Sequence, residues 1–397
     1  MLGFTQTIAW ASSTYLPAIL ADPIARELGI ARSSVFAAFS VSLVVMALAG
    51  PPVGRAIDRH GGRLVLACSN IAFAAGLLLL GWASDAASVF LAWCVLGVAM
   101  AMGLYDAAFA TLVRLHAAAA RGPITGITLI AGFASTVGWP LTAFIAGDFG
   151  WRTSCFAWAA LHLFVALPLN LGCIPSIARV QPGQEPEHSR SDSESRSRQA
   201  LAGGARRRAF ILLALFSAAT AFVTSAMAAH LPGLLLAAGA TPVAALTAAT
   251  LLGPAQVAAR LAEFFAARRY SFHPLLTARI ATALHPVGAL ALGLFAGPLG
   301  ACAFSLLHGS GNGLITIAKG TLPLALFGAR GYGLLQGWLA VLARAMQELA
   351  PYAFGLMLDS YGAMAAVGLS AGLSALALAT LFGLQAKAPL PEREPDR

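Results

Sequence analysis

Apolar residues run through the chain in long stretches that short polar segments separate. Twelve of these stretches hold about 20 or more mostly apolar residues, the length that a helix needs to cross a bilayer. They do not alternate as barrel strands do, and lipid offers no partner to unpaired backbone groups. The pattern therefore predicts twelve transmembrane helices, over residues 3–22, 32–53, 64–83, 88–112, 124–146, 153–173, 209–230, 242–264, 274–295, 299–322, 332–357 and 363–384.

The composition agrees with a membrane protein. Hydrophobic residues make up 58% of the chain and charged residues 10%, and the mean hydropathy is +0.77. The first stretch lacks a basic segment before it and a small-residue cleavage site after it. We therefore expect a retained span there and not a signal peptide.

Positive charge gathers in alternate loops. The loops after the second, fourth, sixth, eighth and tenth stretches are rich in Arg, whereas the intervening loops carry Arg beside Asp and Glu. Because Lys and Arg stay on the cytoplasmic side, we expect both termini in the cytoplasm. This asymmetry explains the net charge of +9. No basic face with interleaved aromatic residues indicates a nucleic-acid partner.

A polar segment divides the chain into two halves. Residues 176–208 are mostly Ser, Arg, Glu, Gly and Pro, a composition that cannot bury enough apolar surface to fold. We expect a disordered cytoplasmic linker there. It would join six-helix bundles over residues 1–175 and 209–385, and a cytoplasmic tail would follow over residues 386–397.

The two halves repeat each other. TYLPAIL in the first stretch matches AHLPGLL in the seventh, and ARGPITG at the start of the fifth matches ARGYGLL at the start of the eleventh. LAGPPVGRAID matches LLGPAQVAARLAE, so Arg55 and Asp58 correspond to Arg260 and Glu263. Parallel six-helix repeats are typical of one large class of secondary transporters. The predicted fold class is an all-α membrane protein of two pseudo-symmetric six-helix bundles.

The loop after the second stretch carries a known motif. The run Gly54-x-x-x-Asp58-Arg59-x-Gly61-Gly62-Arg63 resembles the signature loop of the major facilitator superfamily, at the place where that family has it. The resemblance implies the fold of that superfamily and a loop that locks the two halves together on the cytoplasmic side. The residues to which it gives this role are Gly54, Arg55, Asp58, Arg59 and Arg63 and, through the repeat, Arg260 and Glu263.

Elementary chemistry supports the lock at Asp58. Gly54 lets one helix approach another closely, and the carboxylate of Asp58 can accept hydrogen bonds from amides at a helix N-terminus. The Gly-rich segment GARGYG at the start of the eleventh stretch offers such amides. For Arg63, a lock and a simple topology signal remain equal alternatives.

Ionisable groups inside the apolar stretches are the next candidates, because burying them in a membrane is costly. Asp106 lies on the fourth stretch and Lys319 on the tenth, and the repeat places them one helical turn apart on one face. They would meet across the cavity and close the cytoplasmic gate, or Asp106 would carry the coupling proton. The alternative is that Asp106 bonds a neighbouring helix and Lys319 extends to the interface.

Arg344 and Glu348 stand four apart on the eleventh stretch and are expected to pair, as a static pair or as a contact between the halves. The segment HGSGNG in the tenth stretch predicts substrate contacts at His308 and Asn312, since its glycines expose backbone to a cavity. Further candidates on cavity-lining stretches are Gln6, Tyr15, Thr224 and His230. His162 and His285 are expected to be structural.

These features favour a secondary transporter over two other classes. No G-x-x-x-x-G-K-[ST] loop indicates ATP coupling, and no H-E-x-x-H pair or nucleophile–base pair indicates an enzyme. The five Cys lack zinc-site spacing, so no metal and no cofactor is predicted. A non-transporting sensor is the third class, but such proteins usually add a soluble domain.

The substrate is open between two classes. LYDAAFATLVRL and GFASTVGWPLTAF resemble a bacterial facilitator subgroup that includes exporters of trivalent arsenicals. That resemblance implies a monomeric, proton-coupled exporter of arsenite in a bacterial inner membrane. A small monocarboxylate is the alternative. The fourth stretch lacks the Arg that drug antiporters of the superfamily usually carry, so their coupling mechanism is not implied.

Overall fold

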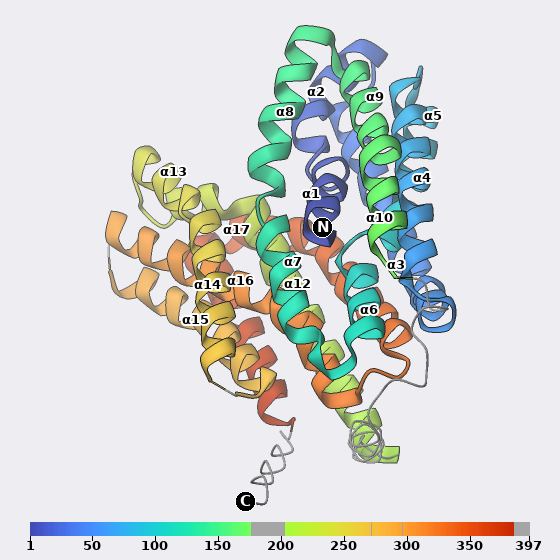
Figure 1. The fold of residues 1–397 in the computed structure, drawn as a ribbon. Coiled ribbons are helices and arrows are strands. Elements are labelled where there is room, and N and C mark those ends of the chain that lie inside the picture. The colour runs from blue at the N-terminus through green and yellow to red at the C-terminus, as the bar shows by residue number, and fades with distance from the viewer. Residues whose placement is uncertain (176–202, 271, 296, 385–397) are drawn as a thin grey trace, which may run out of the picture.

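The computed structural model describes residues 1–175, 203–270, 272–295 and 297–384, which form helices joined by short loops (Figure 1). The first half contains α1 (Leu2–Ala11), α2 (Pro17–Leu28), α3 (Arg32–His60), α4 (Gly62–Gly81), α5 (Ala86–Gly103), α6 (Tyr105–His116), a 3₁₀ turn η1 (Ala117–Ala120), α7 (Arg121–Ala131), α8 (Ala134–Phe149), α9 (Trp151–Leu161), a π-helical turn η2 (His162–Ala166) and α10 (Leu167–Cys173). The second half contains α12 (Gly203–Ala237), α13 (Pro242–Thr250), α14 (Leu252–Arg269), α15 (Pro274–Leu294), α16 (Pro298–Phe327) and α17 (Tyr332–Phe382).

The predicted twelve spans are confirmed. Nine helical segments of the described chain are long and apolar enough to cross a membrane. A further span is divided into α1 and α2, and another is α16, whose hydropathy is lowered by the segment HGSGNG. The twelfth span is the second part of α17, because this long element holds two spans. Gly362, with φ 82° and ψ 177°, turns the chain between them.

Several spans are interrupted near their middle. The first span breaks between Ala11 and Pro17, the fourth at Leu104, which is extended, and the fifth at Gly132 and Phe133. The eighth span breaks at Leu251. Each break leaves backbone N–H and C=O groups without a helical hydrogen-bond partner. Neighbouring groups must therefore form hydrogen bonds with them.

Helix α12 begins six residues before the predicted start of the second half. Gly203 to Arg208 belong to α12 and not to the linker. Ala and Arg are strong helix formers, and the guanidinium of Arg206 lies 5.7 Å from the ring centre of Phe327, which extends the helix. The rest of the predicted linker, 176–202, and the tail lie outside the described residues.

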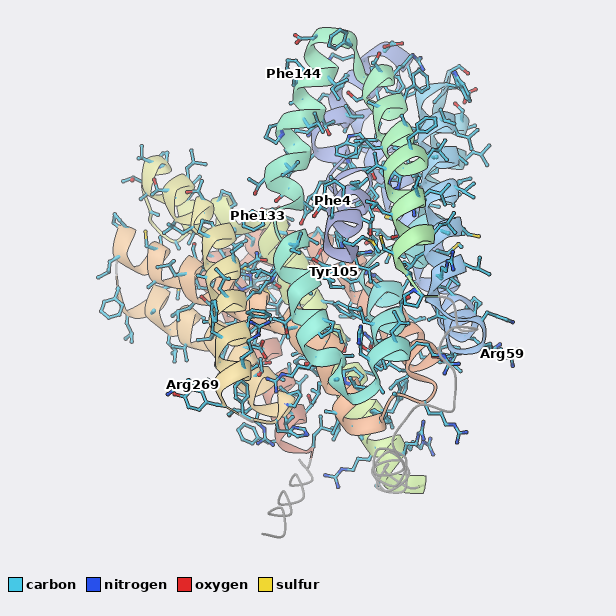
Figure 2. The ribbon with its side chains drawn as sticks, in the orientation of Figure 1. Phe4, Arg59, Tyr105, Phe133, Phe144 and Arg269 are labelled. Carbon is cyan, nitrogen blue, oxygen red and sulfur yellow. The ribbon has the colours of Figure 1, made fainter. Side chains whose placement is uncertain are left out.

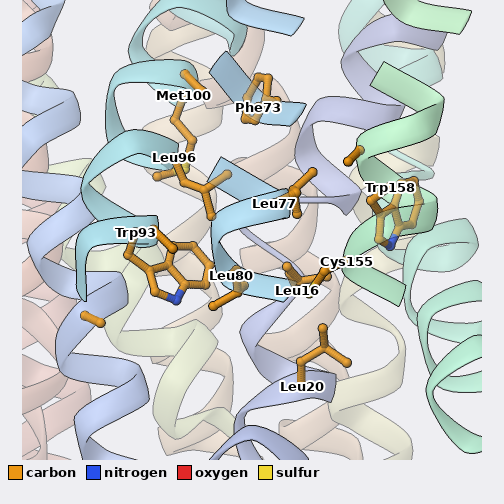
Figure 3. Packing of buried hydrophobic residues seen from close by; sticks show 14 of the residues in the cluster. Leu16, Leu20, Phe73, Leu77, Leu80, Trp93, Leu96, Met100, Cys155 and Trp158 are labelled. Carbon is orange, nitrogen blue, oxygen red and sulfur yellow. The ribbon is translucent and has the colours of Figure 1, made fainter. Parts of the chain in front are cut away.

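Each half has its own apolar core. In the first half, Phe73 and Leu77 of α4 pack against Trp93 and Leu96 of α5, with Trp158 of α9 on the other side (Figure 3). Large apolar side chains on the outer faces remain exposed, among them Phe144 of α8 (Figure 2). A lipid-facing surface explains this pattern, because lipid does not penalise exposed apolar area.

The loops of one end are basic, and we call this end the arginine-rich side. It comprises the turns at Gly61, 117–120, 272–273 and 328–331, and it carries Arg59 and Arg269 (Figure 2). The extensive contacts between the halves link α3 and α6 to α17, and α7 to α14 and α16. These contacts hold the halves together toward the arginine-rich side.

At the opposite end, Glu27 joins three loops of the first half. Its carboxylate accepts hydrogen bonds from Trp151 Nε1 at 2.6 Å and from Arg152 Nε at 2.9 Å. Arg152 also donates to the carbonyl oxygens of Gly81 and Ala83, both at 2.8 Å. The hydrogen bond from Trp151, and then that from Arg152, hold the pKa of Glu27 below its usual value.

This contact predicts a pH-dependent stability. Because the folded pKa of Glu27 is lowered, its contribution is present above the unfolded value of about 4.3 and is lost as the pH falls through the folded value. We expect Glu27→Gln to lower the thermal unfolding midpoint in detergent at pH 7, modestly because the pair is exposed. The difference from the parent should vanish in acid. Asp148→Asn, an exposed carboxylate without a hydrogen bond to the described residues, should change neither midpoint.

Candidate functional site

The backbones of α3 and α17 touch where the halves cross. Gly50 and Gly54 on α3 face Gly333 and Gly337 on α17, so each helix presents a G-x-x-x-G pair to the other. A Cβ atom on Gly54 would overlap the carbonyl group of Gly333, and one on Gly337 would lie 2.6 Å from the Cα of Pro51. Only glycine permits this approach.

The close approach brings Asp58 onto the first turn of α17. Its Oδ1 accepts from the Gly333 amide at 2.9 Å and its Oδ2 from the Leu334 amide at 2.8 Å. These are the hydrogen bonds that the sequence predicted. The carboxylate caps a helix N-terminus, where the helix dipole favours an anion, and it joins two helices of opposite halves.

The repeat builds a second link between α14 and α7. Glu263 of α14 is 3% exposed and pairs with Arg121 Nη2 at 2.8 Å. Thr125 of α7 donates to the same carboxylate at 3.4 Å, and Arg121 donates to the carbonyl oxygen of Phe272 at 2.6 Å. Sequence reasoning missed Arg121. Its signal was the shared ARG triplet that opens the fifth and eleventh spans.

The three arginines of the signature loop, unlike Asp58, make no contact that links the two halves in the described structure. Arg55 and Arg59 are exposed and Arg63 is partly exposed. None of them forms an ion pair or side-chain hydrogen bond with the described part of the chain. Arg260, which occupies the same place in the repeat as Arg55, differs from it in being buried, with an exposed fraction of 6%.

Asp106 pairs with Arg344 and not with Lys319. Asp106 begins α6 just after the break at Leu104, and its Oδ2 lies 3.7 Å from Arg344 Nη2 of α17. The predicted contact between Asp106 and Lys319 is wrong in this conformation, because Arg344 of α17 lies beside Asp106 instead. The pair lines a narrow crevice between the halves, which Gly54 and Gly337 also line.

The predicted pair of Arg344 and Glu348 is also absent from the structure. Arg344 Nη1 donates instead to Gln347 Oε1 at 2.9 Å, besides its contact with Asp106. Lys319 is partly exposed, and its carbonyl oxygen accepts a hydrogen bond from Gln336 Nε2. Arg344 thus serves a contact between the halves, which was one of the two roles considered for it.

Arg260 reaches from α14 to the other half. Its Nη1 donates to the carbonyl oxygen of Thr128 at 3.0 Å, at the C-terminal end of α7, where the helix dipole favours a cation. Its other contacts, with Gly313, Gln256 and Thr316, are all 3.4 Å long. No carboxylate of the described residues pairs with this buried guanidinium.

Four aromatic rings from three spans form a row. Trp139, Tyr15, Trp10 and Tyr105 follow one another with ring centres 5.6, 6.3 and 4.9 Å apart. Tyr105 lies between the two halves in the view of Figure 2. Sequence reasoning selected Tyr15 but missed the rest of this row, because it forms only where the broken spans meet.

Gln6 lies on α1 at the breaks. Its amide nitrogen donates to the carbonyl oxygen of Gly103, at the break in the fourth span, at 2.5 Å. Its Oε1 and the Nε1 of Trp10 are buried without a protein partner in the described structure. Buried polar atoms without partners are unusual and energetically costly.

His308 and Asn312 line a pocket inside the second half. Asn312 accepts from Thr224 of α12 at 3.0 Å. His308 contacts His285 of α15, with 2.6 Å between their Nδ1 atoms, and His285 Nε2 lies 3.1 Å from the hydroxyl of Ser370. His285 was expected to be structural, but it contacts His308 and lines the same pocket.

The remaining histidine candidate joins two helices. His230 Nε2 lies 2.8 Å from the carbonyl oxygen of Pro351. His230 was expected to line the cavity, and in the structure its ring contacts the backbone of a neighbouring helix. In the first half, His162 is fully buried, and its two ring nitrogens contact Ser12 at 2.8 Å and Asn70 at 2.9 Å.

This fold and these links between two bundles are those of a transporter. A family model described as Major Facilitator Superfamily matches residues 2–372, and the chain belongs to that superfamily.

Solved structures share the fold at low identity. A single-residue variant of the E. coli fucose:proton symporter FucP is 16% identical, with a TM-score of 0.70 over 97% of this chain and 98% of that one. FucP in the outward conformation is 15% identical, with a TM-score of 0.72 over the same shares. The human organic anion transporter MFSD10 is 16% identical, with a TM-score of 0.68 over 96% of this chain and 97% of that one.

The glycine contact predicts how the arginine-rich side opens. Gly54→Ala inserts a methyl group between two backbones, and overpacking of this kind is worth about 1–3 kcal/mol. We expect it to separate α3 from α17 and to speed maleimide labelling of Ala340→Cys, a crevice residue, in a chain whose native cysteines are replaced. Gly126→Ala on α7, where an added Cβ meets nothing within 4 Å, is the control. Equal labelling of both variants would contradict the prediction.

The ion pair of Asp106 and Arg344 predicts energetic coupling across the crevice. A double-mutant cycle of Asp106→Asn and Arg344→Gln, read by the same labelling rate, should give a coupling of about 1 kcal/mol or less, because the Asp106 side chain is 33% exposed. The cycle of Asp106→Asn with Lys319→Gln should give a smaller coupling. A larger coupling of Asp106 to Lys319 than to Arg344 would support the pair of Asp106 and Lys319 that the sequence predicted.

Proposed function

We propose that the chain is a secondary active transporter that carries a small organic anion, of the monocarboxylate class, by alternating access. Membership of the superfamily supports transport by two bundles that move against each other. That the solute is an anion is inferred from the charged groups between the halves.

The observation that supports the proposal is the buried guanidinium of Arg260, which has no carboxylate partner among the described residues. Its guanidinium is buried, it keeps its charge at any physiological pH, and its partners among the described residues are neutral oxygens at mostly long distances. The nearest carboxylate along its helix, Glu263, is occupied by Arg121. A buried charge without a counter-ion is strongly unfavourable. A carboxylate of the solute would supply that counter-ion with the planar geometry that Arg prefers.

The links on the arginine-rich side supply the conformational part of the proposal. Asp58 and Glu263 each join a helix of one half to the N-terminal turns of a helix of the other. We assign both, with Gly54, the role of a lock that holds this side closed. The distribution of Arg supports a cytoplasmic location for this side and for both termini in a bacterial inner membrane.

Arsenite export, implied by the sequence resemblance, receives no support from a binding site. The described structure holds no group of three His, Cys, Asp or Glu side chains that could bind a metal ion. The cysteines lie apart, on α4, α5, α9, α10 and α16. Arsenite therefore enters the experiment below as a competing solute.

The test is transport by the purified chain in proteoliposomes. Formate, acetate, lactate, pyruvate, arsenite and choline would be offered one at a time, and counterflow and net efflux would be recorded. We expect exchange of one or more monocarboxylates, and the efflux measurement reads the predicted export direction. Exchange of arsenite without any carboxylate would overturn the assignment.

Variants of Arg260 sharpen this test. Losing one member of a buried charged contact costs about 2–5 kcal/mol, so Arg260→Gln should abolish monocarboxylate exchange. Arg260→Lys keeps the charge but not the planar fork, and should raise KM more than it lowers kcat. The matched control is Arg279→Gln, since Arg279 also donates to backbone carbonyl groups, of Leu381 and Leu384, but lies at the start of α15. Equal losses in both variants would point to folding and not to solute binding.

A further inference from the structure

We infer that Gly132, at the break in the fifth span, is a positioning residue of the proposed anion site. Because Gly132 has no side chain, the guanidinium of Arg260 rests on the end of α7 and turns its Nε–Nη2 edge toward the solute. The inference rests on the proposed function. It adds a residue that sets how tightly the anion binds.

The guanidinium occupies the space that a side chain at residue 132 would fill. A Cβ atom on Gly132 would lie 2.6 Å from Arg260 Nη1, closer than such atoms approach one another. The next atoms are carbonyl oxygens of the preceding turn, of Leu129 at 3.1 Å and of Thr128 at 3.2 Å, which small shifts can accommodate. We call this place, between Gly132 and the carbonyl oxygen of Thr128, the guanidinium seat. Phe133, the next residue, marks it in Figure 2.

The backbone at this position does not itself require glycine. Gly132 has φ −58° and ψ −23°, in the right-handed helical region that L-residues adopt freely. Glycine is less favourable than alanine in such a conformation, because it loses more conformational freedom on folding. Of the described atoms, only Nη1 of Arg260 comes within 3.0 Å of the place of a Cβ atom. The guanidinium is therefore the group that makes glycine necessary here.

One short hydrogen bond holds the guanidinium in its seat. Arg260 Nη1 donates to the carbonyl oxygen of Thr128 at 3.0 Å, and the same oxygen accepts from the Gly132 amide at 3.0 Å. The break leaves carbonyl groups at the end of α7 open to other partners, and the helix dipole favours a cation there. Because a guanidinium is planar and rigid, holding Nη1 restricts the direction in which the other two nitrogen atoms point.

The Nε–Nη2 edge points toward α14 and α16 and is held only weakly. Nε lies 3.4 Å from the carbonyl oxygen of Gly313, and Nη2 lies 3.4 Å from Gln256 Oε1 and from Thr316 Oγ1. Contacts of this length are beyond the usual range of an N–H···O hydrogen bond. Gln256 and Thr316 are partly exposed, so this edge is not sealed inside the protein.

This edge suits a carboxylate. Two parallel N–H groups of one guanidinium bind the two oxygens of a carboxylate in the fork geometry that makes such pairs strong. A solute carboxylate would replace three long contacts with two short ones and leave the bond to Thr128 in place. The guanidinium seat thus acts on the solute through Arg260, without touching the solute itself.

Gly132→Ala is a narrow change that tests this arrangement. The atom nearest to the added methyl group is the end of a flexible side chain, so the guanidinium can move and the backbone of α7 need not. The charge of Arg260 stays in the site but loses its fixed direction. We therefore expect a weaker affinity for the anion in a folded, transporting chain.

The first experiment tests the guanidinium seat without a solute. Phenylglyoxal, which reacts with guanidinium nitrogens, would be added to the purified full chain in detergent, and modification of Arg260 would be followed by mass spectrometry. We expect faster modification in Gly132→Ala than in the parent, because Nη1 leaves its carbonyl partner. Gly126→Ala on the same helix, where an added Cβ meets nothing within 4 Å, should react like the parent. Equal rates in the parent and in Gly132→Ala would overturn the inference.

The second experiment measures the consequence for transport. Counterflow of radiolabelled lactate would be recorded in proteoliposomes over a range of lactate concentrations. Losing one hydrogen bond to a charged group weakens binding about tenfold or more, so Gly132→Ala should raise KM by about that factor and leave kcat near the parent value. Gly126→Ala should keep both constants. A lower kcat at unchanged KM would contradict a positioning role.

A second background shows whether the effect passes through Arg260. Lysine has a compact charge and no planar fork, so it has no edge for the guanidinium seat to direct. In the Arg260→Lys chain, Gly132→Ala should therefore add little to the KM that lysine has already raised. If Gly132→Ala raises KM by the same factor in both backgrounds, the two positions are independent and the inference fails.

Failure of this inference differs from failure of the proposed function. If the parent chain exchanges no monocarboxylate, the proposed function fails, whatever the phenylglyoxal rates show. If the parent exchanges lactate and Gly132→Ala has the same KM as the parent, the guanidinium seat does not position Arg260. If Gly132→Ala does not fold, the chain that also carries Arg260→Lys decides. Recovered folding would support a clash with the guanidinium, and continued unfolding would overturn it.

Discussion

The contact on which the closed arrangement depends is the backbone-to-backbone crossing of α3 and α17. Four glycines let two helices of opposite halves touch without side chains between them. That short separation lets the carboxylate of Asp58 reach two amides of α17 at ordinary hydrogen-bond lengths. The crevice that holds Asp106 and Arg344 lies against the same crossing. Any side chain larger than hydrogen at Gly54 or Gly333 would separate all of these groups together.

The charged groups divide into contacts that are complete and one that is not. Asp58, Glu263 and Asp106 each meet a partner from the other half. The guanidinium of Arg260 also reaches across, but only to a carbonyl oxygen at a helix end. In this closed state the three carboxylates are satisfied, whereas Arg260 has no carboxylate partner among the described residues. Under the proposed function, an anion that binds Arg260 would change the balance between the two halves.

The spans, the repeat and the capping role of Asp58 could be predicted from the sequence, because hydropathy and a Gly-rich helix start are local patterns. The partner of Asp106 could not. Spacing along one helix tells which side chains share a face. It does not tell which residue of the opposite half, Lys319 or Arg344, comes to lie beside Asp106. Arg260 was misjudged for a related reason: its repeat partner Arg55 is exposed, whereas Arg260 meets the end of α7, which exists only because the fifth span is broken.

The breaks themselves are unequally shared between the halves. The first, fourth and fifth spans are interrupted, while their counterparts α12, α16 and the first part of α17 are continuous; only the eighth span reverses this pattern. A continuous helix transmits a displacement along its whole length, whereas an interrupted helix bends at the break. We therefore expect the first half to bend at its breaks, whereas α12, α16 and α17 of the second half can bend at their internal prolines, Pro232, Pro323 and Pro351. Movement that begins at a bound solute would then be absorbed at different points along the helices of the two halves.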